Sequence, residues 1–215
     1  MNGTQTIKRV LRRATGRDRP KTVAPVPLPD YEIPVPEAEP LAPVTLKLRD
    51  DRRVNVRHIC PEDADRLVEL FWRLSADTRW RRFFVPLDNV DSELVRRTAR
   101  RMAAIDRRCE VALAAVACED GHERIVAVAR FACPKAADET VEGSIVVRDD
   151  YQGAGLGSQL LHLLIRAARM RGLRTMTIFT QGDNPAILTI IRRMGVPYTT
   201  SFATGVYEIT LHLAG

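Results

Sequence analysis

A glycine-rich loop, lying between a β-branched run and an amphipathic segment, is the part of this sequence best suited to bind a ligand. Its glycines alternate with other residues, at Gly153, Gly155 and Gly157. Glycines lack a Cβ atom, so the main chain can turn tightly there and bring its N–H groups close to a bound group. The following segment, Ser158–Ile165, has leucines at helical spacing. N–H groups at a helix N-terminus bind phosphate or pyrophosphate, so the sequence predicts a phosphorylated ligand.

The spacing of the loop excludes two common nucleotide motifs. No Gly-Lys-Ser/Thr follows the glycines, so this is not the loop of nucleoside triphosphatases. The dinucleotide fingerprint G-x-G-x-x-G also differs, because here a single residue separates each glycine from the next. What remains is Gln152-x-x-Gly155-x-Gly157 between a predicted strand and a predicted helix. This motif resembles motif A of the GNAT superfamily of N-acetyltransferases, which holds the pyrophosphate of acetyl-CoA.

The resemblance extends from about Val44 to Leu213. Within it, Leu74–Phe84 looks like a segment of a narrower group, the bacterial GNAT protein lysine acetyltransferases. The resemblance implies an α/β (α+β) fold, with a mixed, mostly antiparallel sheet flanked by helices on both faces. Its opening segments look like a hairpin and the start of the first helix: Leu46–Asp50, Val54–Arg57 and Pro61–Leu67.

Periodicity and turn residues place the elements that would carry the loop. Pro61 fits the first position of one helix, and Ser92 the cap of another that runs to about Ala104. Asp120-Gly121 predicts a hairpin turn. The predicted strands are Glu110–Cys118, Ile125–Cys133, Val141–Val147, Thr175–Thr180 and Val206–Leu213. The helix after the loop should end at Gly172, and Pro185–Met194 should form the next helix.

Acetyl transfer to an amine requires a base, because an ammonium has no lone pair and lysine has a pKa of about 10.4. Glu142 lies on the strand that leads to the glycine loop, where alternation puts Glu142, Ser144 and Val146 on one face. In the enzymes that this chain resembles, a glutamate five residues before the final valine of this strand is the general base. The resemblance therefore implies that Glu142 is catalytic. The alternative is that Glu142 lies at the solvated start of the strand.

The resemblance also implies which residues bind acetyl-CoA. The pantetheine arm pairs with the main chain of the strand before the loop, and the loop amides hold the pyrophosphate. The expected residues are Val147, Gln152, Gly153, Ala154, Gly155, Leu156, Gly157 and Ser158. Asn184 matches an asparagine that often touches CoA, although a residue before Pro185 is also an ordinary helix N-cap.

One position departs from the family pattern. Ala154 stands where the family often has Arg or Lys, so one cation near the phosphates is missing. Two alternatives follow: acetyl-CoA binds more weakly, or another arginine, such as Arg192 or Arg193, replaces this cation. Tyr198 is a candidate proton donor to the departing CoA thiolate, with core packing as the alternative.

Composition agrees with one enzyme domain over residues 44–215. The chain has 215 residues, with 45% hydrophobic and 28% charged residues, which is ordinary for a globular protein. No apolar run reaches the length needed to cross a bilayer, and no apolar segment follows the basic N-terminus as in a secretory signal. The four cysteines show no zinc-site spacing, so no metal site is expected. Unpaired thiols favour a cytoplasmic location.

Residues 1–43 form a different region, basic at first and then rich in proline. Dense prolines fix φ and remove backbone donors, so we expect a flexible tail largely without helix or strand. A solvated tether is the simpler interpretation. Contact with nucleic acid, an anionic membrane or a partner protein is the alternative.

The acceptor is less constrained. A net charge of +6 and an arginine-rich stretch favour an acidic protein or an anionic small molecule over a polyamine. Three hypotheses remain: acetylation of a protein lysine, acetylation of a small amine, and a non-catalytic acyl-CoA-binding module. The arginines concerned are Arg79, Arg81, Arg82, Arg96, Arg97, Arg100 and Arg101, which would otherwise form a solvated face.

Overall fold

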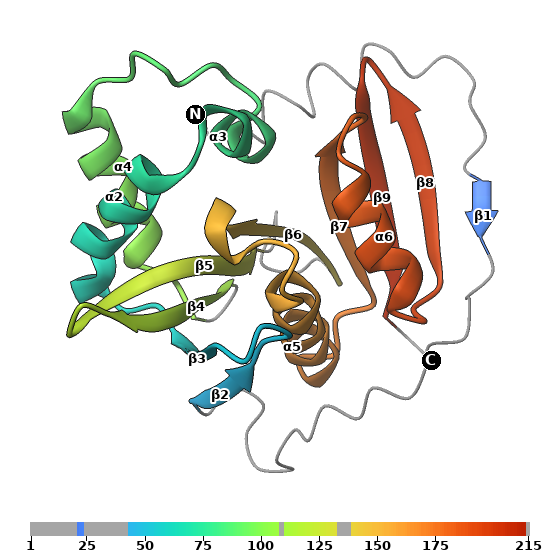
Figure 1. The fold of residues 1–215 in the computed structure, drawn as a ribbon. Coiled ribbons are helices and arrows are strands. Elements are labelled where there is room, and N and C mark those ends of the chain that lie inside the picture. Colours follow the sequence, from blue (N-terminus) through green and yellow to red (C-terminus); the bar gives the residue numbers. More distant parts are fainter. Residues whose placement is uncertain (1–20, 24–42, 108–109, 133–138, 214–215) are drawn as a thin grey trace.

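The computed structural model describes residues 21–23, 43–107, 110–132 and 139–213. Within them the strands form one nine-stranded sheet, in the order β1-β8-β9-β7-β6-β5-β4-β3-β2 (Figure 1). β6 and β7 are parallel, and the other neighbouring strands are antiparallel. The predicted mixed, mostly antiparallel sheet is confirmed. The strands are β1 (Lys21–Val23), β2 (Val44–Lys47), β3 (Arg53–His58), β4 (Glu110–Glu119), β5 (His122–Ala132), β6 (Thr140–Val147), β7 (Thr175–Gln181), β8 (Tyr198–Ala203) and β9 (Val206–His212).

Helices cover both faces of the sheet, as expected (Figure 1). They are α2 (Ala64–Arg73), α3 (Ala76–Phe83), α4 (Ser92–Ala103), α5 (Leu156–Met170) and α6 (Pro185–Arg193), with short 3-10 turns at Pro61–Asp63 and Asp149–Tyr151. The hairpin turn at Asp120 and Gly121 has φ values of 52° and 77°, which suit the tight turn between β4 and β5.

Two details of the helices differ from the prediction. The N-cap of α4 is Asp91 rather than Ser92, because the Asp91 carboxylate accepts a 3.0 Å hydrogen bond from the Glu93 N–H. The helix α3 was not predicted as an element, since its arginines hide any apolar periodicity. Its local signal is Ser75, whose side chain caps the helix by accepting a hydrogen bond from the Thr78 N–H at 3.1 Å.

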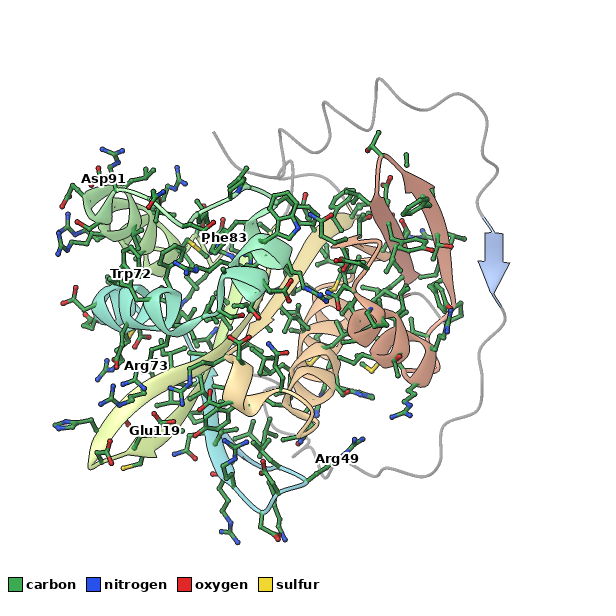
Figure 2. The ribbon with its side chains drawn as sticks, turned by 45° about the horizontal axis from the view of Figure 1, so that its top comes forward. Arg49, Trp72, Arg73, Phe83, Asp91 and Glu119 are labelled. Atoms are coloured by element: carbon green, nitrogen blue, oxygen red, sulfur yellow. The ribbon has the colours of Figure 1, made fainter. Side chains whose placement is uncertain are left out.

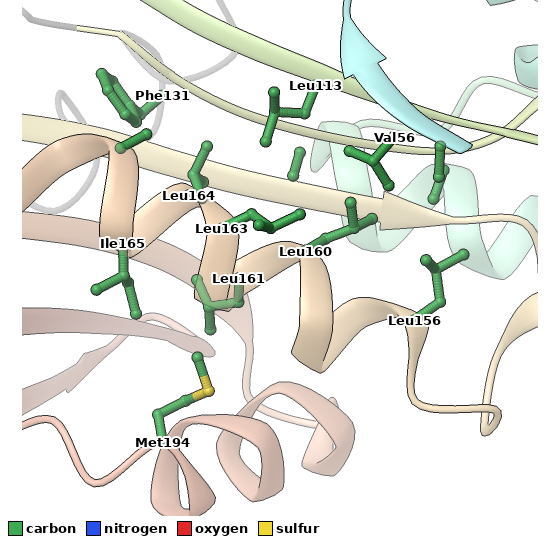
Figure 3. Close-up of a cluster of buried hydrophobic side chains, with 14 of the residues drawn as sticks. Val56, Leu113, Phe131, Leu156, Leu160, Leu161, Leu163, Leu164, Ile165 and Met194 are labelled. Carbon is green, nitrogen blue, oxygen red and sulfur yellow. The ribbon is translucent and has the colours of Figure 1, made fainter. Parts of the chain in front are cut away.

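The core has two layers, one on each side of the sheet. Along β4, Val111, Leu113 and Ala115 belong to the layer that contains α5, whereas Ala112 and Ala114 belong to the layer that contains α2 and α4. The larger layer is built around α5, whose Leu156, Leu160, Leu161 and Leu164 are almost completely buried (Figure 3). Burial of such side chains stabilises by about 1.5–3 kcal/mol each. The helix after the glycine loop is therefore fixed by its packing.

β6 and β7 pair over a short stretch and then separate. Their register begins at Thr140 and Thr175 and ends at Gly143 and Ile178, and beyond this point the two strands diverge (Figure 1). On its other side β6 stays paired with β5 as far as Val147. The result is a fork whose open end lies at the carboxyl ends of two parallel strands.

The N-terminal region lies largely outside the described residues. Lys21–Val23 forms a short strand, β1, paired with β8 at the edge of the sheet, within the segment that was expected to be largely without helix or strand. The rest of the predicted tail of residues 1–43 stays a prediction. No helix in the described residues is long and apolar enough to cross a membrane.

Candidate functional site

The glycine loop lies at the open end of the fork. Gly153 and Gly155 have φ values of 74° and 88°, which side chains with a Cβ rarely adopt. Gly155 is the N-cap of α5, and no side chain caps this helix. A Cβ on Gly157 would lie 3.7 Å from Val147 Cγ2, so the loop and the end of β6 are in contact. The N-terminal amides of α5 are thus open to an anion.

A network of charges around the buried Arg148 holds the start of the loop. Arg148 is 4% exposed and donates to Asp150 at 2.6 and 2.7 Å and to Glu119 of β4 at 3.1 Å. Tyr151 donates from its hydroxyl to the same glutamate at 2.9 Å. The hydrogen bonds to Asp150 and Glu119 raise the pKa of Arg148, so the guanidinium is permanently charged. The chain therefore leaves β6 in a fixed direction.

The turn between β2 and β3 packs against the glycine loop and donates hydrogen bonds to its main chain. The Arg49 N–H donates to the Ala154 carbonyl at 3.1 Å, and Arg52 donates to the Asp150 carbonyl at 2.9 Å. The Arg52 guanidinium also lies 3.9 Å from the centre of the Tyr151 ring. An early hairpin thus fixes the loop, although about one hundred residues separate them.

Arg49 places a cation beside the loop. Its Nε lies 3.4 Å from the position that a Cβ on Gly155 would take. The side chain is exposed at the rim of the molecule (Figure 2) and makes no hydrogen bond or ion pair with a described residue. Ala154 is only 6% exposed and packs in the core. Arg192 and Arg193, expected as substitutes, lie exposed in the last turn of α6.

Helix α3 is tied to both sides of the fork. At its start, Ser75 and Thr78 donate from their hydroxyls to Asp149 at 2.6 and 2.7 Å. Gln152 donates from its amide to Thr78 Oγ1 at 3.2 Å and to the Val147 carbonyl at 2.9 Å. Near the other end, Arg81 lies 3.9 Å from the Asp183 carboxylate, between β7 and α6. α3 therefore spans the opening between the two strands.

Glu142 lies on the face of β6 that α3 covers. It is half-buried and pairs with Ala132 of β5 and Thr177 of β7. The predicted alternation is confirmed, because Val146 packs in the α2–α4 layer whereas Ile145 and Val147 pack in the α5 layer. Glu142 is thus inside the sheet rather than at a solvated strand end, and it faces the space between α3 and the sheet.

Two arginines accompany Glu142 on this face. Arg130 of β5 pairs in register with Ser144, and its Nη2 lies 3.3 Å from Glu110. Arg82 of α3 is half-buried. Burial and the Arg130 guanidinium lower the pKa of Arg82 to about 10, while the carboxylate of Glu142 acts in the opposite direction. Burial likewise lowers the pKa of Arg130.

The remaining candidates are placed as follows. Asn184 is the N-cap of α6, but its side chain makes no capping bond and instead donates to Thr180 at 3.2 Å. Tyr198 is 5% exposed and packs in the α5 layer, on the opposite face from Glu142. The arginines of α3 are half-buried, whereas those of α4 are exposed. The arginines that were predicted to form one surface therefore lie in two different environments, half-buried on α3 and exposed on α4.

Sequence reasoning missed Arg49, Arg82 as an individual residue, and Asp149. Only the unusual Ala154 pointed to a missing cation nearby.

Two hollows in the described surface lie away from the glycine loop, one of about 400 Å³ along Pro86–Leu94 and one of about 460 Å³ beside Ile59 and Ala103–Arg107. Among the described residues, no three potential metal ligands gather in one place.

Comparison with known proteins gives consistent matches. A family model described as the acetyltransferase (GNAT) domain matches residues 53–196. Acetyltransferase PA5475 of Pseudomonas aeruginosa is 31% identical over 148 residues, covering 69% of this chain and 77% of that protein. The GNAT domain of S. lividans PAT superposes with a TM-score of 0.67 at 27% identity, covering 79% of this chain and 96% of that one. L-methionine sulfoximine/L-methionine sulfone acetyltransferase of P. aeruginosa is 48% identical over 56 residues, only 26% of this chain and 33% of that protein.

Proposed function

The chain belongs to the GNAT family of acetyltransferases, and we propose that it acetylates a protein lysine with acetyl-CoA, using Glu142 as general base. The observation that carries this proposal is the position of Glu142. It lies on the strand that leads to the glycine loop, beside the fork between β6 and β7, and beneath α3. The proposed base thus lies on β6, and the proposed phosphate-binding loop follows directly after the end of this strand.

The described residues suit acetyl-CoA, which when bound supplies an activated acetyl thioester. The amides of Gly153 to Ser158 and the N-terminus of α5 would hold the pyrophosphate. The main chain of Val147 borders the open side of the fork, where the pantetheine arm would lie. Asn184, at the start of α6, would contact the cofactor from the other strand.

Arg49 takes the place of the missing family cation in this proposal. A guanidinium beside Gly155 is close to the amides that would hold the pyrophosphate. Charge-assisted hydrogen bonds from arginine to phosphate are about twice as strong as neutral ones. Because Arg49 comes from the hairpin rather than from the loop, Ala154 is free to pack in the core.

Glu142 would accept the proton of the incoming ammonium, directly or through a water, and so free the lone pair that attacks the thioester carbonyl. The C–S bond then breaks, and the departing CoA thiolate takes up the second proton of the nitrogen. Loop and strand amides near the thioester oxygen would stabilise the negative charge that develops there. The reaction needs no further nucleophile from the protein.

A protein acceptor is favoured by exposed apolar side chains around this face. Trp72, Trp80, Val85 and Leu94 are each between 39% and 45% exposed, and all belong to α2, α3, α4 or the segment between α3 and α4. Exposed apolar groups that gather in one layer are typical of protein contact surfaces. The likeness of Leu74–Phe84, now seen as α3 and its flanks, to lysine acetyltransferases supports the same acceptor.

A small amine is the second candidate, because of the local 48% identity to an acetyltransferase of amino-acid analogues. The location proposed for either reaction is the cytoplasm, consistent with the unpaired thiols of Cys60 and Cys118.

The test is acetyl-CoA-dependent release of free thiol by the purified protein. Cell extract is divided into a protein fraction and a low-molecular-weight filtrate, and each is supplied as acceptor. Turnover with the protein fraction, with acetyl-lysine in the recovered peptides, supports the proposal. Turnover with the filtrate alone would replace it with the small-amine function. Acetyl-CoA binding without turnover on either fraction would favour a non-catalytic acyl-CoA-binding module.

A further inference from the structure

Building on the proposed function, we infer that the acceptor carries a carboxylate beside the amine that is acetylated, and that Arg82 binds this carboxylate together with Arg130. The two arginines and Glu142 lie between α3 and the same face of the sheet. Glu142 would receive the proton of the amine, and the guanidinium groups would hold the neighbouring anion.

The one carboxylate that acts on the Arg82 guanidinium among the described residues is that of Glu142. The guanidinium lies over the ring of Phe83, with 5.3 Å between its carbon and the ring centre, and makes no hydrogen bond or ion pair with a described residue. The neighbouring Arg81, in contrast, lies 2.8 Å from Asp77. When Glu142 takes the proton of the amine, the Arg82 guanidinium loses this neighbouring charge, and a half-buried guanidinium without a nearby anion is costly. The ligand is the natural source of that anion.

Arg130 offers a second guanidinium on the same face. It is opposite Ser144 in the register of β5 and β6, and Ser144 shares its face of β6 with Glu142. Its side chain is 15% exposed, and its contact with Glu110 uses Nη2 at 3.3 Å. A guanidinium carries five N–H donors, so donors remain for a second carboxylate. The planar fork of arginine matches a carboxylate better than a point charge does.

The charge of the acceptor leads to the same conclusion. An acceptor amine approaches Glu142 as an ammonium, which the nearby Arg82 and Arg130 would repel. A carboxylate close to the ammonium cancels this repulsion and brings an acceptor of no net charge into a half-buried site. Burial and Arg130 lower the pKa of Arg82, which agrees with two like charges sharing one region of low polarity.

Two kinds of acceptor have this chemistry. One is a protein lysine with an Asp or Glu as neighbour, and the other is a free amino acid, whose carboxylate adjoins its amine. Both present a carboxylate near a primary amine, and each can be compared with a matched amide that has nearly the same shape but no charge.

The experiment measures kcat/KM for matched pairs of acceptors. Lysine peptides with neighbouring Glu or Gln form one set, and free amino acids with their carboxamides form the other. We expect the wild type to prefer the charged member by at least about tenfold, the effect of one or two charged hydrogen bonds. In Arg82→Gln the ratio should fall toward one. Arg97→Gln, on the exposed face of α4, should keep the ratio. Arg82→Lys, which keeps the charge but loses the fork, should give an intermediate ratio, and the melting temperature of each variant shows whether it folds.

Other outcomes would overturn the inference. One is an equal kcat/KM of the wild type for the charged and the uncharged acceptor of each pair. Loss of activity in Arg82→Gln by the same factor for both members is another, because Arg82 would then act on Glu142 and not on the acceptor. Turnover on the protein fraction but on no pair also overturns the inference and leaves the proposed function intact. A charge preference seen with free amino acids alone supports the anion site and instead overturns the protein-lysine acceptor.

Discussion

Thr78 donates a hydrogen bond of 2.7 Å to Asp149, although 71 residues separate them. Thr78 lies in the first turn of α3, and Asp149 follows the last residue of β6 by two positions. The same threonine accepts a hydrogen bond from Gln152 of the glycine loop at 3.2 Å. The helix over Glu142 and the loop for the cofactor phosphates are thereby joined through one hydroxyl.

Loss of the Asp149 carboxylate should loosen both elements. Asp149→Ala removes the acceptor for Ser75 and Thr78, and because the group is partly solvated we expect a loss of about 1–2 kcal/mol in the free energy of unfolding. Hydrogen exchange should accelerate in α3, and acetyl-CoA should bind more weakly. Asp88→Ala, at an exposed position in the segment after α3, serves as the control. Unchanged exchange in α3 would show that the contact does not hold the helix.

Glu142→Gln tests the base. The amide keeps the shape of the side chain but accepts no proton, so kcat should fall by about 10²–10⁴-fold. The dissociation constant of acetyl-CoA, measured by calorimetry, should change little, because Glu142 is not among the proposed cofactor contacts. Full activity in Glu142→Gln would assign the proton transfer to another residue.

Arg49→Ala tests the cation beside the loop. Removal of one phosphate contact should weaken acetyl-CoA binding about tenfold, equivalent to about 1.4 kcal/mol. The loss should diminish at high salt, because an exposed charge is screened. Arg53→Ala is the matched control, since Arg53 lies exposed on the same hairpin. If both variants and the wild type bind acetyl-CoA with equal affinity, Arg49 does not contact the phosphates, and Arg192 and Arg193 are the next residues to test.

Asp63 should make the stability of the domain depend on acid. The side chain is fully buried and accepts hydrogen bonds from Arg57 at 2.7 and 2.8 Å. Burial alone would raise the pKa of Asp63, but the hydrogen bonds from Arg57 and the Cys60 N–H lower it to about 2. A carboxyl whose pKa is lower in the folded state stabilises the folded protein at pH values above the pKa of the unfolded state. About 2 kcal/mol should therefore be lost as the pH falls from about 4 toward 2.

Denaturant unfolding of Asp63→Asn checks this prediction. At pH 7 the variant should be less stable by about 3 kcal/mol, because Arg57 loses its buried partner. The difference from the wild type should narrow as the pH approaches 2. Asp65→Asn, at an exposed position on α2, is the matched control. A constant difference at all pH values would mean that the pKa of Asp63 is the same in the folded and unfolded states.

The sequence alone determined the features that depend on neighbouring residues. The glycine loop follows from three glycines at a strand–helix junction, and two of them do adopt positive φ. The Asp120-Gly121 turn and the alternation of Glu142 with its neighbours on β6 are equally local. Such features are readable because a turn or a strand imposes its own periodicity over a few residues. The mixed, mostly antiparallel character of the sheet came from resemblance to a known family, whereas the order of its strands was not predicted.

Only the tertiary structure decided which distant groups meet at the site. Arg49 lies beside the loop because the β2–β3 turn packs against it, and Arg82 lies near Glu142 because α3 is held at Asp149 and Asp183. In the sequence, Arg82 is one arginine among several on two helices, and nothing local separates it from those of α4. The difference is burial, which depends on where α3 lies on the sheet. Burial also determines whether a guanidinium remains solvated or needs an anion, so the specificity of the site could not be read from the sequence.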